Sequence, residues 1–285
     1  MKGIVLAAGK GTRLYPMTKP VCKPLLPVYD KPLIYYPIAI LMQAGISDIM
    51  VIVPPGETDT FTALLGDGSQ FGVKICYAEQ PVARGIADAL IIGQEFVGND
   101  RVCLVLGDNI FYSPDLSNTL KRAAADDRGA TVFGYWVDDP RPFGVVEFDQ
   151  TGKAISIEEK PRFPKSNYVI PGLYFYDHQV MDIARGLKPS ARGELEITDV
   201  NLEYLRRGQL QVVPLEKDFT WLDAGTAESL LDAGMKIREI QDTTGRYVGC
   251  LEELGLYEGW VNEEQVHEVG KELGMTLYGQ YLQCL

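Results

Sequence analysis

The chain has 285 residues, 46% of them apolar and 23% charged, so it is long enough to bury a sizeable hydrophobic core. Its 27 Lys and Arg stand against 39 Asp and Glu, and the resulting net charge of −12 argues against nucleic-acid binding. The five widely spaced cysteines form no CxxC pair, which argues against a disulfide framework and a zinc site. The same cysteine pattern favours a reducing cytoplasm. No apolar run approaches about 18 residues, so we expect no membrane span.

The first 110 residues alternate short apolar runs with helix-like stretches. The apolar runs are typical of buried parallel strands and occupy residues 3–8, 48–53, 73–78 and 102–107. Between them we expect helices that begin near Asp30, Glu57 and Ile86, the first with Lys31 and Pro32 in its opening turn. The order βαβαβαβ predicts a doubly wound, Rossmann-like α/β core.

After residue 130 the pattern changes to strands joined by turns. Four segments have this pattern: ATVFGYWV, GVVEFD, AISIEEK and YVIPGLYFY. They predict a mixed, mostly parallel sheet with an antiparallel part. Helices are expected at about 178–186 and 196–207, a strand at 210–215, and helices from Thr226 onwards. We place a soft boundary near residues 225–240, before a C-terminal helical segment.

The segment LAAGKGTR at residues 6–13 follows the first strand, where an open α/β sheet places its ligand crevice. Gly9 and Gly11 let the backbone approach a polyphosphate, and Lys10 and Arg13 add positive charge, so the segment suits a phosphate cradle. A glycine pair alone would equally suit an ordinary turn with solvated charges. A dinucleotide fingerprint fails because Leu14 stands where a third glycine is needed, and a P-loop fails because no Ser or Thr follows Gly9-Lys10.

Three further residues suit a phosphate and metal site. Lys23 lies in a loop stiffened by two prolines, which can hold its ammonium near the same phosphates. Asp108 follows an apolar strand at its carboxyl end, although it can also cap a turn with Asn109. Asp223 lies in a second strand-to-helix turn, and two such carboxylates can converge on one Mg²⁺.

Glu159 and Lys160 end another strand. Because side chains alternate along a strand, Glu159 is expected to face away from Lys160. The pattern alone therefore favours a solvated strand end, and a shared ligand requires a twist or a bulge.

The segments LAAGKGTRL, KPLLPVYDKPLIYYP, LGDGSQFG, LVLGDNIFY, FGVVEF, EEKP, GLYFYD, ARGELEITDVN and WLDAGT occur in that order. In order and spacing they resemble the glucose-1-phosphate thymidylyltransferases, from residue 1 to about 240 and more weakly to the C-terminus. The resemblance implies a catalytic domain over residues 1–240, with a nucleotide-binding part at about 1–110 and a sugar-binding part at about 111–225. Residues 241–285 would form a C-terminal helical segment.

The resemblance also implies a reaction. The phosphate of glucose 1-phosphate would attack the α-phosphorus of dTTP, giving dTDP-glucose and pyrophosphate with Mg²⁺ as cofactor. Such a displacement needs alignment and charge neutralisation rather than a protein nucleophile. A homo-oligomer, namely a tetramer, is the assembly that the family implies.

Residue roles follow from the same motifs. Asp108 and Asp223 would hold Mg²⁺ and, with Arg13, Lys23 and Lys160, form the catalytic set. The nucleotide would be bound by Ala8, Gly11, Thr12, Arg13, Lys23, Gln80 and Gly85. The glucose and its phosphate would be bound by Gly144, Glu159, Lys160, Ile170, Tyr174 and Arg192.

Three alternative functions are compared with thymidylyl transfer. The loop at residues 81–85 differs from the usual family pattern beside the base, so a uridylyl- or broader-specificity transferase stays an alternative. A non-catalytic sugar-nucleotide sensor would be expected to lose a metal carboxylate or a phosphate cation, and this chain keeps them. A dinucleotide-dependent dehydrogenase fails at Leu14 and lacks an acidic ribose ligand after the second strand.

Overall fold

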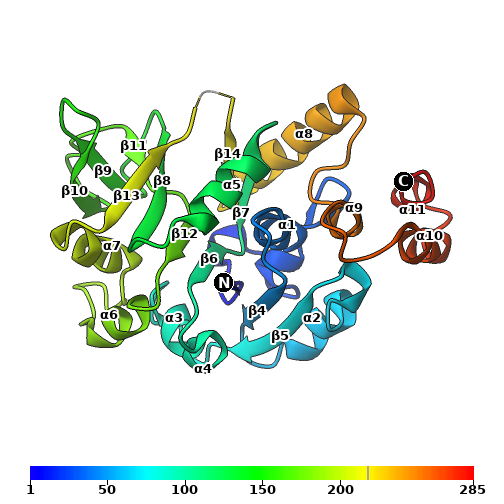
Figure 1. Ribbon diagram of the computed structural model, residues 1–285, viewed down its shortest axis with the longest axis horizontal. Helices are drawn as coiled ribbons and strands as arrows, with labels where there is room; N and C mark the ends of the chain where they lie inside the picture. The colour runs from blue at the N-terminus through cyan, green and yellow to red at the C-terminus, as the bar shows by residue number, and fades with distance from the viewer. Residues whose placement is uncertain (217) are drawn as a thin grey trace.

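A computed structural model describes residues 1–216 and 218–285. Its centre is a ten-stranded sheet in the order β10-β9-β11-β8-β12-β6-β1-β4-β5, with β13 paired to β8 (Figure 1). Side chains fully buried on the two faces of this sheet form two large apolar clusters. The sheet is therefore the frame on which the rest of the molecule is packed.

One half of the sheet is parallel and has the predicted βαβ order. Its strands are β1 (Lys2–Leu6), β4 (Asp48–Val53), β5 (Lys74–Glu79) and β6 (Val102–Leu106), all parallel to their neighbours in this half. The intervening helices are α1 (Tyr35–Gln43), α2 (Thr58–Leu65), α3 (Asp88–Ile92) and α4 (Gln94–Val97). The doubly wound α/β fold expected from the sequence is confirmed.

The other half of the sheet is mostly antiparallel. Strand β12 (Leu173–Tyr176) runs antiparallel to both β6 and β8 (Ala130–Trp136) and so joins the two halves. The remaining elements of this half are β9 (Gly144–Phe148), β10 (Ala154–Glu159), β11 (Tyr168–Val169), α6 (Val180–Gly186), α7 (Ile197–Arg206) and β13 (Leu210–Pro214). The predicted change from parallel to mixed pairing after residue 130 is thus present.

Two local predictions were wrong. The helix expected near Asp30 begins instead at Tyr35, and a short antiparallel pair of β2 (Pro27–Val28) and β3 (Lys31–Pro32) precedes it. Asp30 does not cap a helix because its carboxylate pairs with the buried Lys31 ammonium at 2.6 Å. The segment YVIPGLYFY forms two strands rather than one, because Pro171 interrupts the ladder between β11 and β12.

A second, small sheet and the C-terminal helices complete the fold. Strand β7 (Asn109–Tyr112) pairs antiparallel with β14 (Thr220–Asp223), and helix α5 (Leu116–Ala125) follows β7. The later helices are α8 (Ala227–Thr244), α9 (Leu251–Tyr257), α10 (Glu263–Glu272) and α11 (Leu277–Leu282). Figure 1 shows α10 and α11 at the end of the molecule opposite β9 and β10. Among the described helices, none combines the length and apolarity needed to cross a membrane.

Helix α9 connects the C-terminal segment to the main core. Leu251 is fully buried in the same apolar cluster as the central strands. The helix lies against the 3₁₀ helix η3 (Ser69–Phe71), and a Cβ atom added at Gly255 would lie 2.3 Å from the carbonyl oxygen of Phe71. A glycine is therefore required at this crossing.

We expect Gly255→Ala to lower the free energy of unfolding by about 1–3 kcal/mol, because the added methyl group overpacks the contact between α9 and η3. Urea denaturation followed by circular dichroism measures this change. Gly186→Ala in α6 is the matched control, since an added Cβ there meets no atom within 4 Å. Equal stability of the Gly255→Ala variant and the unsubstituted protein would contradict the described packing of α9.

Candidate active site

A cavity of about 720 Å³ opens at the carboxyl ends of β1 and β6. This is the edge where an open α/β sheet binds its ligands. Most of the residues proposed from the sequence line it: Ala8, Arg13, Lys23, Gln80, Gly85, Asp108, Gly144, Glu159, Lys160, Ile170, Tyr174 and Asp223. Segments that lie far apart in the sequence therefore meet around one concave space.

The glycine-rich loop forms one side of this cavity. Gly11 has a left-handed φ of 59° and precedes the 3₁₀ helix η1 (Thr12–Leu14), and its carbonyl accepts a hydrogen bond from Thr18 Oγ1 at 2.6 Å. Gly11 and the exposed Thr12 shape the loop, whereas Ala8, Gly9 and Arg13 line the cavity. Of the loop that the sequence predicts to cradle phosphate, residues 8, 9 and 13 therefore line the cavity.

The two candidate metal carboxylates are brought together by the pairing of β7 with β14. Asp223 lies opposite Asn109 in this pairing, and the backbone N–H of Ala224 donates to the carbonyl of Asp108 at 3.1 Å. The buried Lys23 places its Nζ atom 2.5 Å from Asp108 Oδ2. Residues 23, 108 and 223 therefore belong to one cluster of opposite charges.

The electrostatics of Asp223 reflect this cluster. Burial raises the pKa of the Asp223 carboxyl, and the negative charge of Asp108 raises it further. The positive charges of Lys23, Arg13 and Lys160 act in the opposite direction. Two carboxylates that repel each other, surrounded by three cations, form a site that can accept both a metal cation and a polyanion.

Asn109 is a site residue whose role the sequence did not reveal. Its buried Oδ1 accepts hydrogen bonds from Trp221 Nε1 at 2.7 Å and from the backbone N–H of Gly172 at 3.0 Å. Its Nδ2 donates to Asp108 Oδ1 at 2.8 Å. One amide thus fixes Asp108, β14 and the start of β12 relative to one another. The only sequence signal was its position directly after Asp108 at a strand end.

Glu159 and Lys160 both line the cavity, although strand alternation would point them in opposite directions. The alternation fails because Lys160 has a φ of 44°, which turns the chain out of the pleat as β10 ends. Lys160 Nζ lies 3.6 Å from Glu159 Oε1, and Thr198 Oγ1 donates to Glu159 Oε2. Burial and the charges of Glu159 and Asp108 raise the pKa of Tyr174, so its hydroxyl stays protonated.

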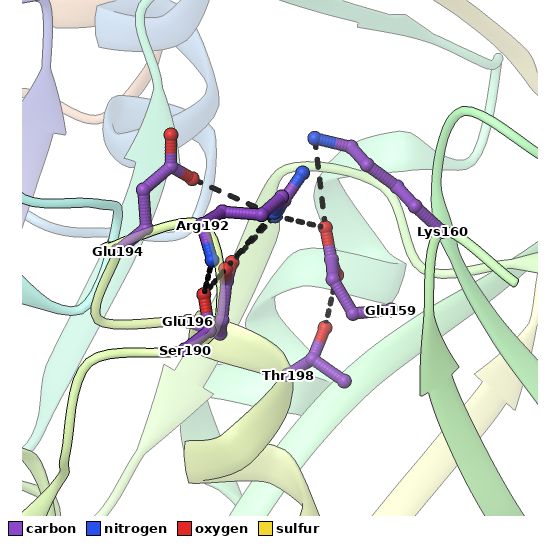
Figure 2. Close-up of polar contacts among 7 residues, drawn as sticks. All are labelled: Glu159, Lys160, Ser190, Arg192, Glu194, Glu196 and Thr198. Atoms are coloured by element: carbon purple, nitrogen blue, oxygen red, sulfur yellow. Dashed lines mark hydrogen bonds and ion pairs between the residues drawn. The ribbon is translucent and has the colours of Figure 1, made fainter.

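Arg192 lies outside the cavity lining but contacts two residues that belong to it, Glu159 and Glu194. Figure 2 shows its guanidinium among three carboxylates. Arg192 Nη2 lies 2.8 Å from Glu196 Oε2, 3.2 Å from Glu159 Oε1 and 3.5 Å from Glu194 Oε2. Ser190 Oγ also donates to Glu196 Oε1 at 2.7 Å (Figure 2). The buried Glu196 therefore holds Arg192 at the rim of the site. The three carboxylates already neutralise the positive charge of Arg192.

Gln80 and the loop after it form another part of the cavity lining. Gln80 follows β5, and its backbone N–H donates to the carbonyl of Val53 at 3.0 Å. Gly85 has a φ of 110°, and a Cβ atom there would lie 2.4 Å from the carbonyl oxygen of Leu195. The loop can therefore approach the backbone before α7 only with a glycine at position 85. Ile197, Thr198 and Asn201, from this helix, are lining residues that the sequence did not indicate.

We expect Asn109→Ala to lower the free energy of unfolding by about 1–3 kcal/mol, because it leaves the buried donors of Trp221 and Gly172 without partners. Urea titration followed by tryptophan fluorescence measures the change. Asn118→Ala removes an exposed side-chain amide from α5 and is expected to change stability by less than about 0.5 kcal/mol. Equal effects of the two substitutions would refute the joining role of Asn109.

Comparison with known proteins gives a consistent result. The family model for nucleotidyl transferases matches residues 2–240. A glucose-1-phosphate thymidylyltransferase from Neisseria meningitidis is 55% identical, over 99% of this chain and 98% of its own length. A glucose-1-phosphate thymidylyltransferase from Mycolicibacterium smegmatis is 54% identical, again over 99% of this chain and 98% of its own length.

Solved structures agree with the fold. A crystal structure from Bacillus anthracis, of a candidate glucose-1-phosphate thymidylyltransferase in complex with sucrose, has a TM-score of 0.78 and 46% identity. The similarity covers 84% of this chain and 96% of that one. A UDP-glucose pyrophosphorylase complexed with UDP-glucose has a TM-score of 0.73 at 24% identity, with 84% of this chain and 98% of that one covered, which supports the fold alone. The chain belongs to the nucleotidyl transferase family and, within it, to the glucose-1-phosphate thymidylyltransferases.

Proposed function

We propose that this enzyme transfers a thymidylyl group from dTTP to glucose 1-phosphate in a Mg²⁺-dependent reaction, giving dTDP-glucose and pyrophosphate. The observation that carries the proposal is the cluster of Asp108, Asp223, Lys23, Arg13 and Lys160 around one cavity. The relatives' names supply glucose 1-phosphate and the thymidylyl group.

In the proposed reaction, a phosphate oxygen of glucose 1-phosphate attacks the α-phosphorus of dTTP. A new P–O bond forms as the bond from the α-phosphorus to the bridging oxygen breaks, and pyrophosphate leaves with that electron pair. The protein is required to align the two phosphates and neutralise the developing negative charge. Lys23, Arg13 and Lys160 supply positive charge for this purpose.

The residues present fit a magnesium ion. Mg²⁺ is typically held by one or two carboxylates, with substrate phosphates and water completing its shell. Over the described ranges 1–216 and 218–285, no group of three or more His, Cys, Asp or Glu side chains forms a complete protein cage. We propose that Asp108 and Asp223 hold Mg²⁺, which would neutralise phosphate charge when bound.

Substrate binding is proposed to rearrange two ion pairs. Lys23 Nζ lies 2.5 Å from Asp108 Oδ2 and neutralises this carboxylate. The Lys23 ammonium would pair with the triphosphate when Asp108 serves as a Mg²⁺ ligand. Arg192, paired with Glu159 and Glu196, would likewise share its charge with the phosphate of the sugar. The ion pairs made before substrate binds keep the long side chains of Lys23 and Arg192 ordered, so that they are already positioned to bind phosphate.

The sugar and base sites follow the same reasoning. Glu159, which accepts a hydrogen bond from Thr198, suits sugar hydroxyls, and the protonated Tyr174, which lines the same cavity, would also contact the sugar. Gly144 and Ile170 also line the cavity and would contact the sugar, whereas Gln80 and Gly85, which line it too, would contact the base. A uridylyl transferase stays the alternative, because Arg84 and its neighbours depart from the family pattern beside the base.

Three broader expectations stay predictions. Residues 1–240 would form the catalytic domain with 241–285 as an attached helical segment, a division supported by the match of the family model to residues 2–240. A homotetramer is expected from the family resemblance. A cytoplasmic setting is supported by the five free cysteines.

We expect pyrophosphate release with glucose 1-phosphate, Mg²⁺ and dTTP, and a decrease in kcat/KM of about 100-fold or more in Asp108→Asn, because one metal carboxylate is lost. A coupled pyrophosphate assay over dTTP, UTP, CTP, ATP and GTP measures both. Removal of Mg²⁺ with EDTA is expected to abolish the signal, and added Mg²⁺ to restore it.

Asp100→Asn is the matched control, since Asp100 is an exposed aspartate in the loop before β6. Its activity is expected to equal that of the unsubstituted enzyme. Preference for UTP over dTTP would favour the uridylyl alternative. Absence of pyrophosphate release with every nucleotide would refute catalysis and favour the sugar-nucleotide sensor.

A further inference from the structure

Asp88 occupies a buried position next to Gln80. Its side chain is 1% exposed, and its two oxygens have different partners. Oδ1 lies 2.6 Å from Arg84 Nη2, whereas Oδ2 accepts a hydrogen bond from Gln80 Nε2 at 2.9 Å. The chain therefore contains a short relay from Arg84 through Asp88 to the amide of Gln80.

The relay determines which way the Gln80 amide points. A carboxylate accepts hydrogen bonds and donates none, and the second neighbour of Gln80 Nε2, the carbonyl of Gly85 at 3.4 Å, is also only an acceptor. The NH₂ group of Gln80 must face these two acceptors. Within the described part of the chain no group donates to Gln80 Oε1, and Gln80 lines the cavity. Its free oxygen is thus available to a ligand as an acceptor.

The loop that carries the relay is fixed by its backbone. The N–H of Leu195 donates to the carbonyl of Arg84 at 2.6 Å, and the N–H of Ala87 donates to the carbonyl of Leu195 at 3.2 Å. Gly85 lies so close to Leu195 that a Cβ atom would clash with its backbone. Asp88 and Gln80 consequently keep a defined separation rather than adapting freely to a ligand.

We propose that Asp88 is a positioning residue for base selection: by fixing Gln80 Oε1 as an acceptor, it selects pyrimidines with an N3–H donor and rejects cytosine. The inference rests on the proposed function, because it assumes that Gln80 contacts the base of the nucleotide substrate. Thymine and uracil carry a hydrogen at N3, whereas the N3 of cytosine has only a lone pair. With cytosine, the N3 lone pair would face Gln80 Oε1, so two acceptors would meet away from water. Their repulsion lowers the affinity for cytosine nucleotides.

The substitution Asp88→Asn reverses the relay. The Arg84 guanidinium can only donate hydrogen bonds, so the oxygen of the introduced amide must face Arg84. The NH₂ group of that amide then faces Gln80. The Gln80 side chain must turn its oxygen towards the introduced NH₂ group and present its own NH₂ group to the cavity. A donor there suits N3 of cytosine and opposes N3–H of thymine and uracil.

The test uses dUTP and dCTP, which lack the methyl group and differ at the N3 and C4 edge of the base. We expect Asp88→Asn to lower the ratio of kcat/KM for dUTP to that for dCTP by about tenfold or more. The double variant Gln80→Glu/Asp88→Asn is expected to restore the preference for dUTP, because a carboxylate at position 80 offers one oxygen to the amide at position 88 and the other to the base. Pyrophosphate release with glucose 1-phosphate and Mg²⁺ is the readout for all variants, with dTTP as the reference.

Two further variants distinguish an effect on base selection from a loss of protein stability. Arg84→Ala removes the ion pair but leaves the acceptor-only carboxylate of Asp88, so the ratio is expected to be kept even where stability falls. Asp59→Asn makes the same chemical change at an exposed aspartate in the first turn of α2 and is expected to alter nothing. Urea titration of each variant reports its stability independently.

The outcomes are distinct. A lowered ratio in Asp88→Asn that returns in the double variant supports the inference. An unchanged ratio, with activity lowered equally for both nucleotides, means that Asp88 only supports the fold and overturns the inference while the proposed function stands. No turnover of dTTP by the unsubstituted enzyme overturns the proposed function and the inference together.

Discussion

The antiparallel pairing of β14 with β7 is the constraint on which the active site depends. Asp108 follows β6, the last strand of the parallel half along the chain. Asp223 lies more than a hundred residues later in the sequence. The pairing brings their backbones together, and the Asn109 amide connects Asp108 to Trp221 of β14. Repulsion between the two carboxylates opposes this arrangement, so packing and hydrogen bonds elsewhere must compensate for it.

The positive charges offset that repulsion while also preparing the site for phosphate. Lys23 contacts Asp108 directly, and Arg13 and Lys160 act on Asp223 from other elements. Arg192 is held by carboxylates at the rim in a similar way. The net charge of the chain is −12, so attraction of a triphosphate depends on these few local cations. For triphosphate binding, the positions of these cations thus matter more than the electrostatic field of the whole protein.

The sequence predicts the sheet and the crevice well, because buried apolar strands followed by glycines or carboxylates have a strong local pattern. Asp108 at a strand end is an example. Other features depend on contacts between distant segments. Asp30 has the pattern of a helix cap but pairs with Lys31, and the positive φ of Lys160 breaks the alternation that a strand predicts. The relay from Asp88 to Gln80 cannot be predicted from the sequence either, since sequence order does not indicate how an amide is oriented.

The position of the metal tests the proposed site most directly. Crystals grown with Mn²⁺ in place of Mg²⁺ and with a dTTP analogue whose α,β-bridging oxygen is replaced by methylene would locate the ion by anomalous scattering. We expect one peak beside Asp108, Asp223 and the triphosphate, with the Lys23 ammonium paired with a phosphate. A metal bound away from either carboxylate, or Lys23 still paired with Asp108 beside the bound nucleotide, would contradict the proposed site.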